Sequence, residues 1–143
     1  MKPFEYFIET GEVKEVSKNP ALARSLIKDL LDRTKDIKLL DISKFSKIVF
    51  ENIYDALRDF ADAILAIDGY KSYSHQASFA YLLRYNFDEP SLDLLDKFRY
   101  KRNGSKYYGE RISKEEAEEI FNFYEKIEQR IKEIAKKRGV LWT

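Results

Sequence analysis

The sequence predicts an all-α fold: an antiparallel four-helix-type bundle with an additional short helix. Apolar residues recur at steps of three and four along most of the chain, which is the spacing of one helix face. The 5 glycines and 3 prolines fall near the points where this spacing stops. No segment alternates apolar and polar residues for long enough to indicate a sheet.

The first clear helix is expected to begin at Asn19-Pro20, an N-cap residue followed by the proline favoured at the first helical position. Its apolar stripe consists of Leu22, Leu26, Ile27, Leu30 and Leu31. Before it, residues 1–18 allow one short helical turn ending at Gly11. The apolar residues able to pack there are Phe4, Phe7, Ile8, Val13 and Val16.

A long second helix is predicted from about Ile42 to Ile67, with Gly69 just beyond it as a C-terminal cap. Its stripe is formed by Phe45, Ile48, Val49, Ile53, Ala56, Leu57, Phe60, Ala63, Ile64 and Ile67. Seven turns of consistent spacing make this the best-defined element of the sequence.

Three more helices follow. Ser74 can cap a third helix, which the stretch from Asn86 to Pro90 interrupts, and Ser91 can start a fourth that continues through Phe98. The last helix opens with a capping box at Ser113 to Glu116. It is acidic at its start and basic at its end, an arrangement that complements the helix dipole.

Composition limits the functions that the chain can have. Its 143 residues predict one domain, 1–143. The 26 basic and 25 acidic side chains give a net charge of +1, so any contact with nucleic acid must be local. The absence of cysteine excludes disulfides, thiol catalysis and cysteine-bound zinc. Without a signal peptide or an apolar run of about 20 residues, we expect a cytoplasmic protein with no membrane contact.

One stretch of the sequence is purely basic: residues 97–109 contain five basic side chains and no acidic one. We expect a glycine-broken loop at 99–109 between two helices. A solvated helix end would explain the charges, because cations are favourable near a helix C-terminus. The tyrosines among them suggest an alternative, in which rings stack on bases while cations hold phosphates. The residues concerned are Lys97, Arg99, Tyr100, Lys101, Arg102, Lys106, Tyr107 and Tyr108.

Within this stretch, Arg102 is followed by Asn103 and, five places after the arginine, by the ring of Tyr107. This pattern resembles the signature of the HEPN family, small helical-bundle proteins associated with minimal nucleotidyltransferases. Further segments follow in family order, and the resemblance spans roughly residues 20–135. These segments are Ala23–Leu26, Glu51–Arg58, Gly69–His75 and Leu94–Gly109.

The resemblance implies a homodimer whose protomers share a cleft, where active members of the family cleave RNA without metal or other cofactor. Arg102 would hold the phosphate, Asn103 would orient it, and Tyr107 stands where active members have a histidine. A phenol has a reference pKa near 10 against about 6.5 for imidazole and is a poor base at neutral pH. The resemblance therefore implies retained binding of RNA or nucleotide, through Arg99, Lys101, Arg102, Asn103, Lys106 and Tyr108.

Two other sets of residues have alternative interpretations. His75, the only histidine, could reach the Arg102 cleft and replace the missing base, or could bond locally in the first turn of the third helix. Asp55, Asp59 and Asp62 lie on one face of the second helix and could bind a metal. The neighbouring Arg58 favours an ordinary salt-bridged face instead, and we expect no metal site.

Three functions remain open at this stage. The first is a homodimeric HEPN-like partner of a minimal nucleotidyltransferase that binds nucleotide or RNA. The second is a metal-independent ribonuclease acting as the toxin of a toxin–antitoxin pair, with Arg102 and Tyr107 as its catalytic residues. The third is a purely structural bundle whose basic patch has no ligand.

Overall fold

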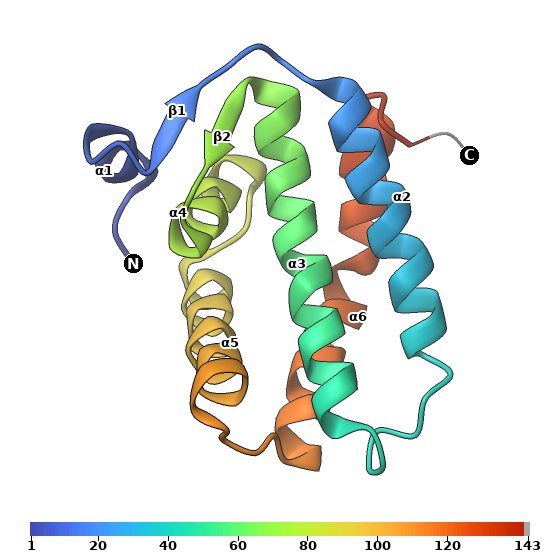
Figure 1. Cartoon of the computed structure of the whole chain (residues 1–143). Coiled ribbons are helices and arrows are strands. Elements are labelled where there is room, and N and C mark those ends of the chain that lie inside the picture. The colour runs from blue at the N-terminus through green and yellow to red at the C-terminus, as the bar shows by residue number, and fades with distance from the viewer. Residues whose placement is uncertain (142–143) are drawn as a thin grey trace.

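The computed structural model describes residues 1–141 and confirms the all-α prediction; the last two residues of the predicted domain lie outside this range. Successive long helices run in opposite directions (Figure 1), and a small two-stranded sheet accompanies them. The elements are α1 (Phe4–Glu9), β1 (Val13–Glu15), α2 (Pro20–Ile37), α3 (Ser46–Asp68), β2 (Tyr70–Ser72), α4 (His75–Ala80), the 3-10 helix η1 (Tyr81–Tyr85), α5 (Glu89–Tyr108) and α6 (Lys114–Lys137).

Helix α3 is the centre of the bundle. It contacts α2 and α6 on one side and α4 and α5 on the other. The apolar face that periodicity predicted accounts for most of its buried residues, and the buried side chains of the described chain form one cluster. Burying one large aromatic or aliphatic side chain contributes about 1.5–3 kcal/mol to the free energy of unfolding. The largest fully buried side chains include Tyr54, Phe60, Phe79, Phe98 and Tyr124.

Several of the predicted helix ends are confirmed, but α3 begins at Ser46 and not near Ile42. The Asn19 side chain accepts a hydrogen bond from the backbone of Leu22, and Ser113 forms its capping box with Glu116. Gly69 ends α3 with φ 89°, a conformation that glycine adopts without steric cost. The start of α5 differs from the prediction, because Asp88 is the N-cap and Ser91 is its hydrogen-bond donor.

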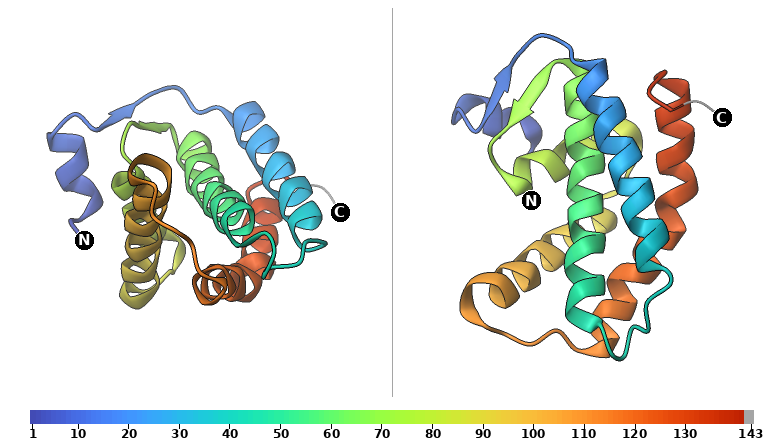
Figure 2. Two further views of the ribbon diagram at one scale, coloured as in Figure 1. Left: turned by 60° about the horizontal axis from the view of Figure 1, so that its bottom comes forward. Right: turned by 45° about the vertical axis from the view of Figure 1, so that its right-hand side comes forward.

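The two-stranded sheet was not predicted from the sequence. Strands β1 and β2 pair antiparallel, with Val13 opposite Ser72 and Glu15 opposite Tyr70. Each strand has only three residues, too few to show a two-residue alternation. Figure 2 shows α1 and the two-stranded sheet on the side of the bundle away from α6. The strand pairing holds the N-terminal segment against the residues that lead into α4.

Asp68 joins three elements at one end of the bundle. It accepts hydrogen bonds from the hydroxyls of Tyr81 (2.5 Å) and Tyr85 (2.6 Å), and it pairs with Arg138 at 2.6 Å. Burial alone would raise the pKa of Asp68, but these three donors outweigh it and lower the pKa. We call these four residues the Asp68 cluster. It links the end of α3 to η1 and to the end of α6.

Within residues 1–141, every helix is too short or too polar to cross a lipid bilayer.

Candidate functional site

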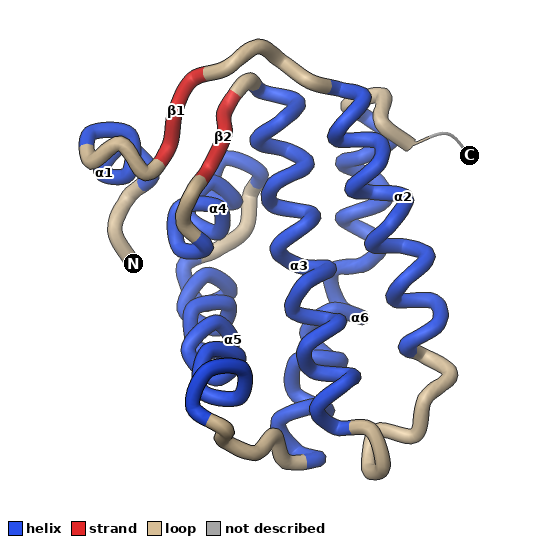
Figure 3. The backbone as a smooth tube through the Cα atoms, in the orientation of Figure 1, coloured by secondary structure: helices blue, strands red, loops and turns tan. Residues whose placement is uncertain are grey.

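The basic stretch expected to be a loop is helical. Helix α5 continues to Tyr108 and ends at Gly109, whose φ is 68° (Figure 3). The prediction was wrong because contacts with α3 hold this half of the helix in place: the Ser105 hydroxyl donates to Glu51 at 3.3 Å. These contacts offset the cost of Gly104 inside a helix, about 1 kcal/mol relative to alanine.

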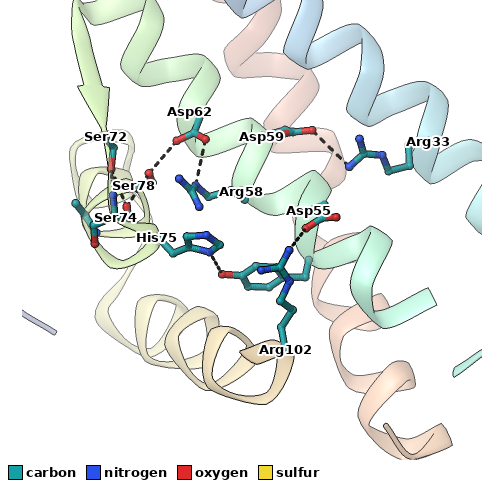
Figure 4. Close-up of polar contacts among 12 residues, drawn as sticks. Arg33, Asp55, Arg58, Asp59, Asp62, Ser72, Ser74, His75, Ser78 and Arg102 are labelled. Atoms are coloured by element: carbon teal, nitrogen blue, oxygen red, sulfur yellow. Dashed lines mark hydrogen bonds and ion pairs between the residues drawn. The ribbon is translucent and has the colours of Figure 1, made fainter. Parts of the chain in front are cut away.

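Arg102 points inward from α5 to α3. Its Nη2 pairs with the Asp55 carboxylate at 3.3 Å, and its guanidinium carbon lies 5.3 Å from the centre of the Tyr54 ring (Figure 4). Only 12% of its side chain is exposed, and its Nε is buried with no hydrogen-bond partner among the described residues. In this conformation Arg102 therefore joins two helices.

Tyr107 lies on a different side of α5. Residues five apart on an α-helix are separated by about 140° around its axis, and the Tyr107 side chain is 63% exposed while that of Arg102 is only 12% exposed. No contact between the two is recorded in the described structure. The implied pair of Arg102 and Tyr107 facing one recess is therefore not formed within this chain.

The basic stretch is also less positive in three dimensions than in the sequence. Arg99 pairs with Asp96 at 2.8 Å, a residue just outside the stretch. Helix α6 supplies the other acids, with Lys97 bound to Glu119 at 3.0 Å and Lys101 bound to Glu116 at 3.1 Å. Lys106 instead has its amine 5.7 Å from the Tyr107 ring centre.

His75 does meet the Arg102 side chain, through Tyr54. The Tyr54 hydroxyl lies 2.6 Å from Nδ1 of His75, and Figure 4 shows His75 and Arg102 pointing toward the same region from α4 and α5. Burial raises the pKa of Tyr54, so the phenol keeps its proton at neutral pH. With an imidazole that carries its hydrogen on Nε2, the Tyr54 hydroxyl donates a hydrogen bond to Nδ1.

The charge around His75 works against a role as base. Burial is the largest cause that lowers the pKa of His75 to about 4, and the nearby cations Arg58, Arg102, Arg99 and Lys106 lower it further. An imidazole with this pKa is neutral at pH 7 and accepts a proton weakly. The geometry brings His75 to Arg102 but does not make it a substitute for the missing histidine.

The three aspartates considered as metal ligands each have an arginine partner. Asp55 pairs with Arg102, Asp59 with Arg33 at 3.5 Å, and Asp62 with Arg58 at 3.1 Å. Burial raises the pKa of Asp59 to about 6 and also raises that of Asp62. Among residues 1–141, no group of three potential ligands is arranged to hold a metal ion.

A recess of about 470 Å³ lies on the outer side of α5, and we call it the α5 recess. It contains three of the predicted binding residues, Arg99, Asn103 and Tyr108, together with Tyr107. Three of its rings are largely exposed, which is unusual for aromatic side chains. Its lining residues are Arg99, Tyr100, Asn103, Gly104, Tyr107, Tyr108 and Glu110.

Sequence reasoning missed two residues of this region. Tyr54 lies among the apolar residues of α3, and only its hydroxyl distinguished it in the sequence from an ordinary core residue. Glu110 follows the basic stretch directly, and its charge was the available signal. A second recess of about 500 Å³, between α2, α3 and the two-stranded sheet, is mostly apolar and contains none of the predicted binding residues, although Asp62 lines it.

Comparison with known proteins leaves the family open: no protein-family model, no curated protein and no solved structure matches this chain. The resemblance to HEPN proteins thus rests on the residues of the sequence.

Proposed function

We propose that this chain is a cytoplasmic HEPN-like protein that binds nucleotide or RNA at the C-terminal half of α5, with weak or no catalysis. The observation that carries the proposal is the α5 recess, where exposed tyrosines gather beside Arg99 and Asn103. Exposed rings stack on bases of any sequence, and a guanidinium attracts phosphate. Binding at this recess needs no cofactor.

The same site favours binding over cleavage. Cleavage without metal requires a base close to the reacting hydroxyl. The one imidazole of the chain has its pKa lowered to about 4 and is hydrogen-bonded to Tyr54. Arg102 is held by Asp55 and is only 12% exposed. Neither group is presented to a phosphodiester in this conformation.

Fluorescence anisotropy with a short single-stranded RNA at low salt tests the binding. Replacing Tyr107 by alanine removes one stacking surface, so we expect the affinity to fall by about 1–3 kcal/mol, roughly 5- to 150-fold. Arg99→Ala is expected to weaken binding and to reduce its salt dependence. Tyr6→Ala is the matched control, because Tyr6 is 40% exposed but lies on α1. An RNA that fails to bind the unmodified protein at low salt contradicts the proposal.

The proposal includes a homodimer that is the partner of a minimal nucleotidyltransferase. The support is the family resemblance together with the exposed rings of Tyr100, Tyr107 and Tyr108, which are 75%, 63% and 80% exposed. Sedimentation equilibrium tests the dimer, and co-purification with any minimal nucleotidyltransferase that is encoded beside this chain tests the partner. A monomer at high protein concentration contradicts the first, and separate elution of the two proteins contradicts the second.

The alternative is a metal-independent ribonuclease toxin of a toxin–antitoxin pair. One observation favours it: His75 and Arg102 meet at Tyr54, so a rearrangement of Arg102 would place a histidine beside an arginine. Incubation with RNA in the presence of a chelator tests this function. Cleavage that His75→Gln abolishes supports the enzyme, whereas equal cleavage by that variant indicates a contaminating nuclease.

A further inference from the structure

One carboxylate of the α5 recess has no basic partner. Glu110 forms no ion pair with any described residue, although the carboxylates of Asp55, Asp96, Glu116 and Glu119 nearby are all paired. It follows Gly109, so the turn that ends α5 brings it back over the helix. Its backbone nitrogen donates to the Gly104 carbonyl at 3.1 Å.

Gly104 makes room for this carboxylate. A side chain on residue 104 would place its Cβ only 2.7 Å from the Glu110 carboxyl carbon, much closer than atoms normally approach. Gly104 is buried, and its φ is not in the left-handed region. Glycine at position 104 is therefore explained by the space that the Glu110 side chain needs, and not by an unusual backbone conformation.

Asn103 lies next to Gly104 and lines the same recess. Its amide forms no hydrogen bond recorded among the described residues, so both its donor and its acceptor are free for a ligand. The recess thus combines an acceptor pair on Glu110, a donor on Asn103 and the rings of Tyr107 and Tyr108. These are the elements with which proteins read single-stranded bases.

The order of donors and acceptors distinguishes the bases. Guanine carries two adjacent donors, N1–H and the N2 amine, beside the acceptor O6. Adenine and cytosine each offer one amine next to a ring nitrogen that would face a carboxylate lone pair. Uracil has a single N–H between two carbonyl oxygens. Two oxygens of one carboxylate can therefore be satisfied together only by guanine.

We propose that the α5 recess recognises a guanine base, with Glu110 accepting from N1–H and the N2 amine, and with Asn103 donating to O6. One of the two tyrosine rings stacks on the base. Arg99 pairs with Asp96 through its Nε, and its remaining N–H groups are the donors offered to the phosphate. The inference rests on the proposed nucleotide binding and adds a preference among bases. The volume of the α5 recess, about 470 Å³, is sufficient for a nucleotide.

Calorimetric titration with 5′-GMP and 5′-AMP tests the preference. We expect GMP to bind between about fivefold and a hundredfold more tightly, as one bidentate contact implies. Glu110→Gln replaces one acceptor oxygen by an amide NH2 donor and should reduce the ratio of the two affinities to near one. Glu125→Gln, a change of the same kind on α6 outside the recess, should leave the ratio unchanged.

Gly104→Ala is a second variant, since its methyl group displaces the Glu110 carboxylate and should also remove the preference. Circular dichroism confirms that both variants remain folded. Equal affinities for GMP and AMP in the unmodified protein overturn the guanine inference and leave the proposed nucleotide binding intact. If neither GMP nor AMP binds, the guanine inference and the proposed nucleotide binding are both overturned.

Discussion

Two regions of this protein contain the same kinds of residues in opposite states. In the Asp68 cluster, the hydroxyls of Tyr81 and Tyr85 and the guanidinium of Arg138 all bind one carboxylate. In the α5 recess, the tyrosines are exposed and Glu110 has no basic partner among the described residues. Composition alone does not distinguish the two regions.

The difference shows which groups are available to a ligand. A carboxylate with three donors within 2.6 Å has its acceptor capacity largely used, and moving one donor costs about 1–3 kcal/mol. The Glu110 carboxylate needs no such rearrangement. We therefore interpret the Asp68 cluster as a structural junction and the α5 recess as the binding surface.

The largest effect is expected at the junction. Asp68→Ala leaves two tyrosine hydroxyls and Arg138 without their acceptor, so we expect the free energy of unfolding to fall by about 2–4 kcal/mol. Urea denaturation measures it, with Asp93→Ala on the exposed side of α5 as control. A loss for Asp68→Ala no larger than for the control contradicts the structural role. Because the folded pKa of Asp68 is lowered, its contribution is full above pH 4 or so and is lost as the pH falls through the folded pKa.

An Arg102 variant tests whether the contacts of this side chain with α3 hold α5 in place. Arg102→Ala removes the Asp55 ion pair and the contact with the Tyr54 ring, and we expect a loss of about 1–2 kcal/mol in the free energy of unfolding. Lys106→Ala should change it by less than about 0.5 kcal/mol. Equal losses in the two variants would show that Arg102 has no special structural role.

His75 gives a direct measure of the charge between α3, α4 and α5. As the only histidine, it has unambiguous imidazole proton resonances, and we expect its NMR titration to give a pKa of about 4. Its folded pKa is lowered, so its contribution to stability is full above about pH 6.5 and is lost as the pH falls toward 4. In Tyr54→Phe the pKa should rise, because the donor to Nδ1 that favours the neutral ring is gone.

A titration with the ordinary midpoint of a solvated histidine would contradict this arrangement. Denaturation curves are a less specific measure, because Asp59, with its pKa raised to about 6, acts in the opposite direction. That carboxyl takes up a proton more readily in the folded state, so acidification through pH 6 stabilises the fold at Asp59 while it destabilises the fold at His75.

The smallest effect on stability is expected in the α5 recess. Tyr108 is 80% exposed, so Tyr108→Ser should change the free energy of unfolding by less than about 0.5 kcal/mol. The same variant should weaken RNA binding, since it removes a ring that bases can stack on. Thermal unfolding and anisotropy measured on one preparation separate the two effects. A large loss of stability would place Tyr108 in the packing of the bundle.

The sequence predicts the helices well where local signals agree with packing. Asn19, Gly69 and Ser113 have cap functions that depend on neighbouring residues alone, and the stripe of α3 is long enough to fix its buried side. The α5 end was mispredicted because Gly104 and Gly109 have different roles. Gly109 ends the helix, whereas Gly104 lies inside it and makes room for Glu110.

The site was harder to predict because its partners come from distant segments. Asp55 lies 47 residues from Arg102, and Tyr54 lies 21 residues from His75. A linear run of basic residues predicts a positive surface only if no acid from another helix reaches it, and here Glu116 and Glu119 of α6 do. Pairing of this kind depends on helix packing and leaves no mark in the local sequence.

The pairing of β1 with β2 affects the order in which the molecule folds. Strand β1 leaves the ribosome well before its partner β2, and all of α2 and α3 is synthesised between them. Phe4 and Phe7 are buried in the folded protein. They therefore have no surface to pack against until the central helix has been synthesised. Closing so long a segment costs entropy that only an assembled bundle can offset. The first part of the chain to be made is thus expected to be among the last to fold.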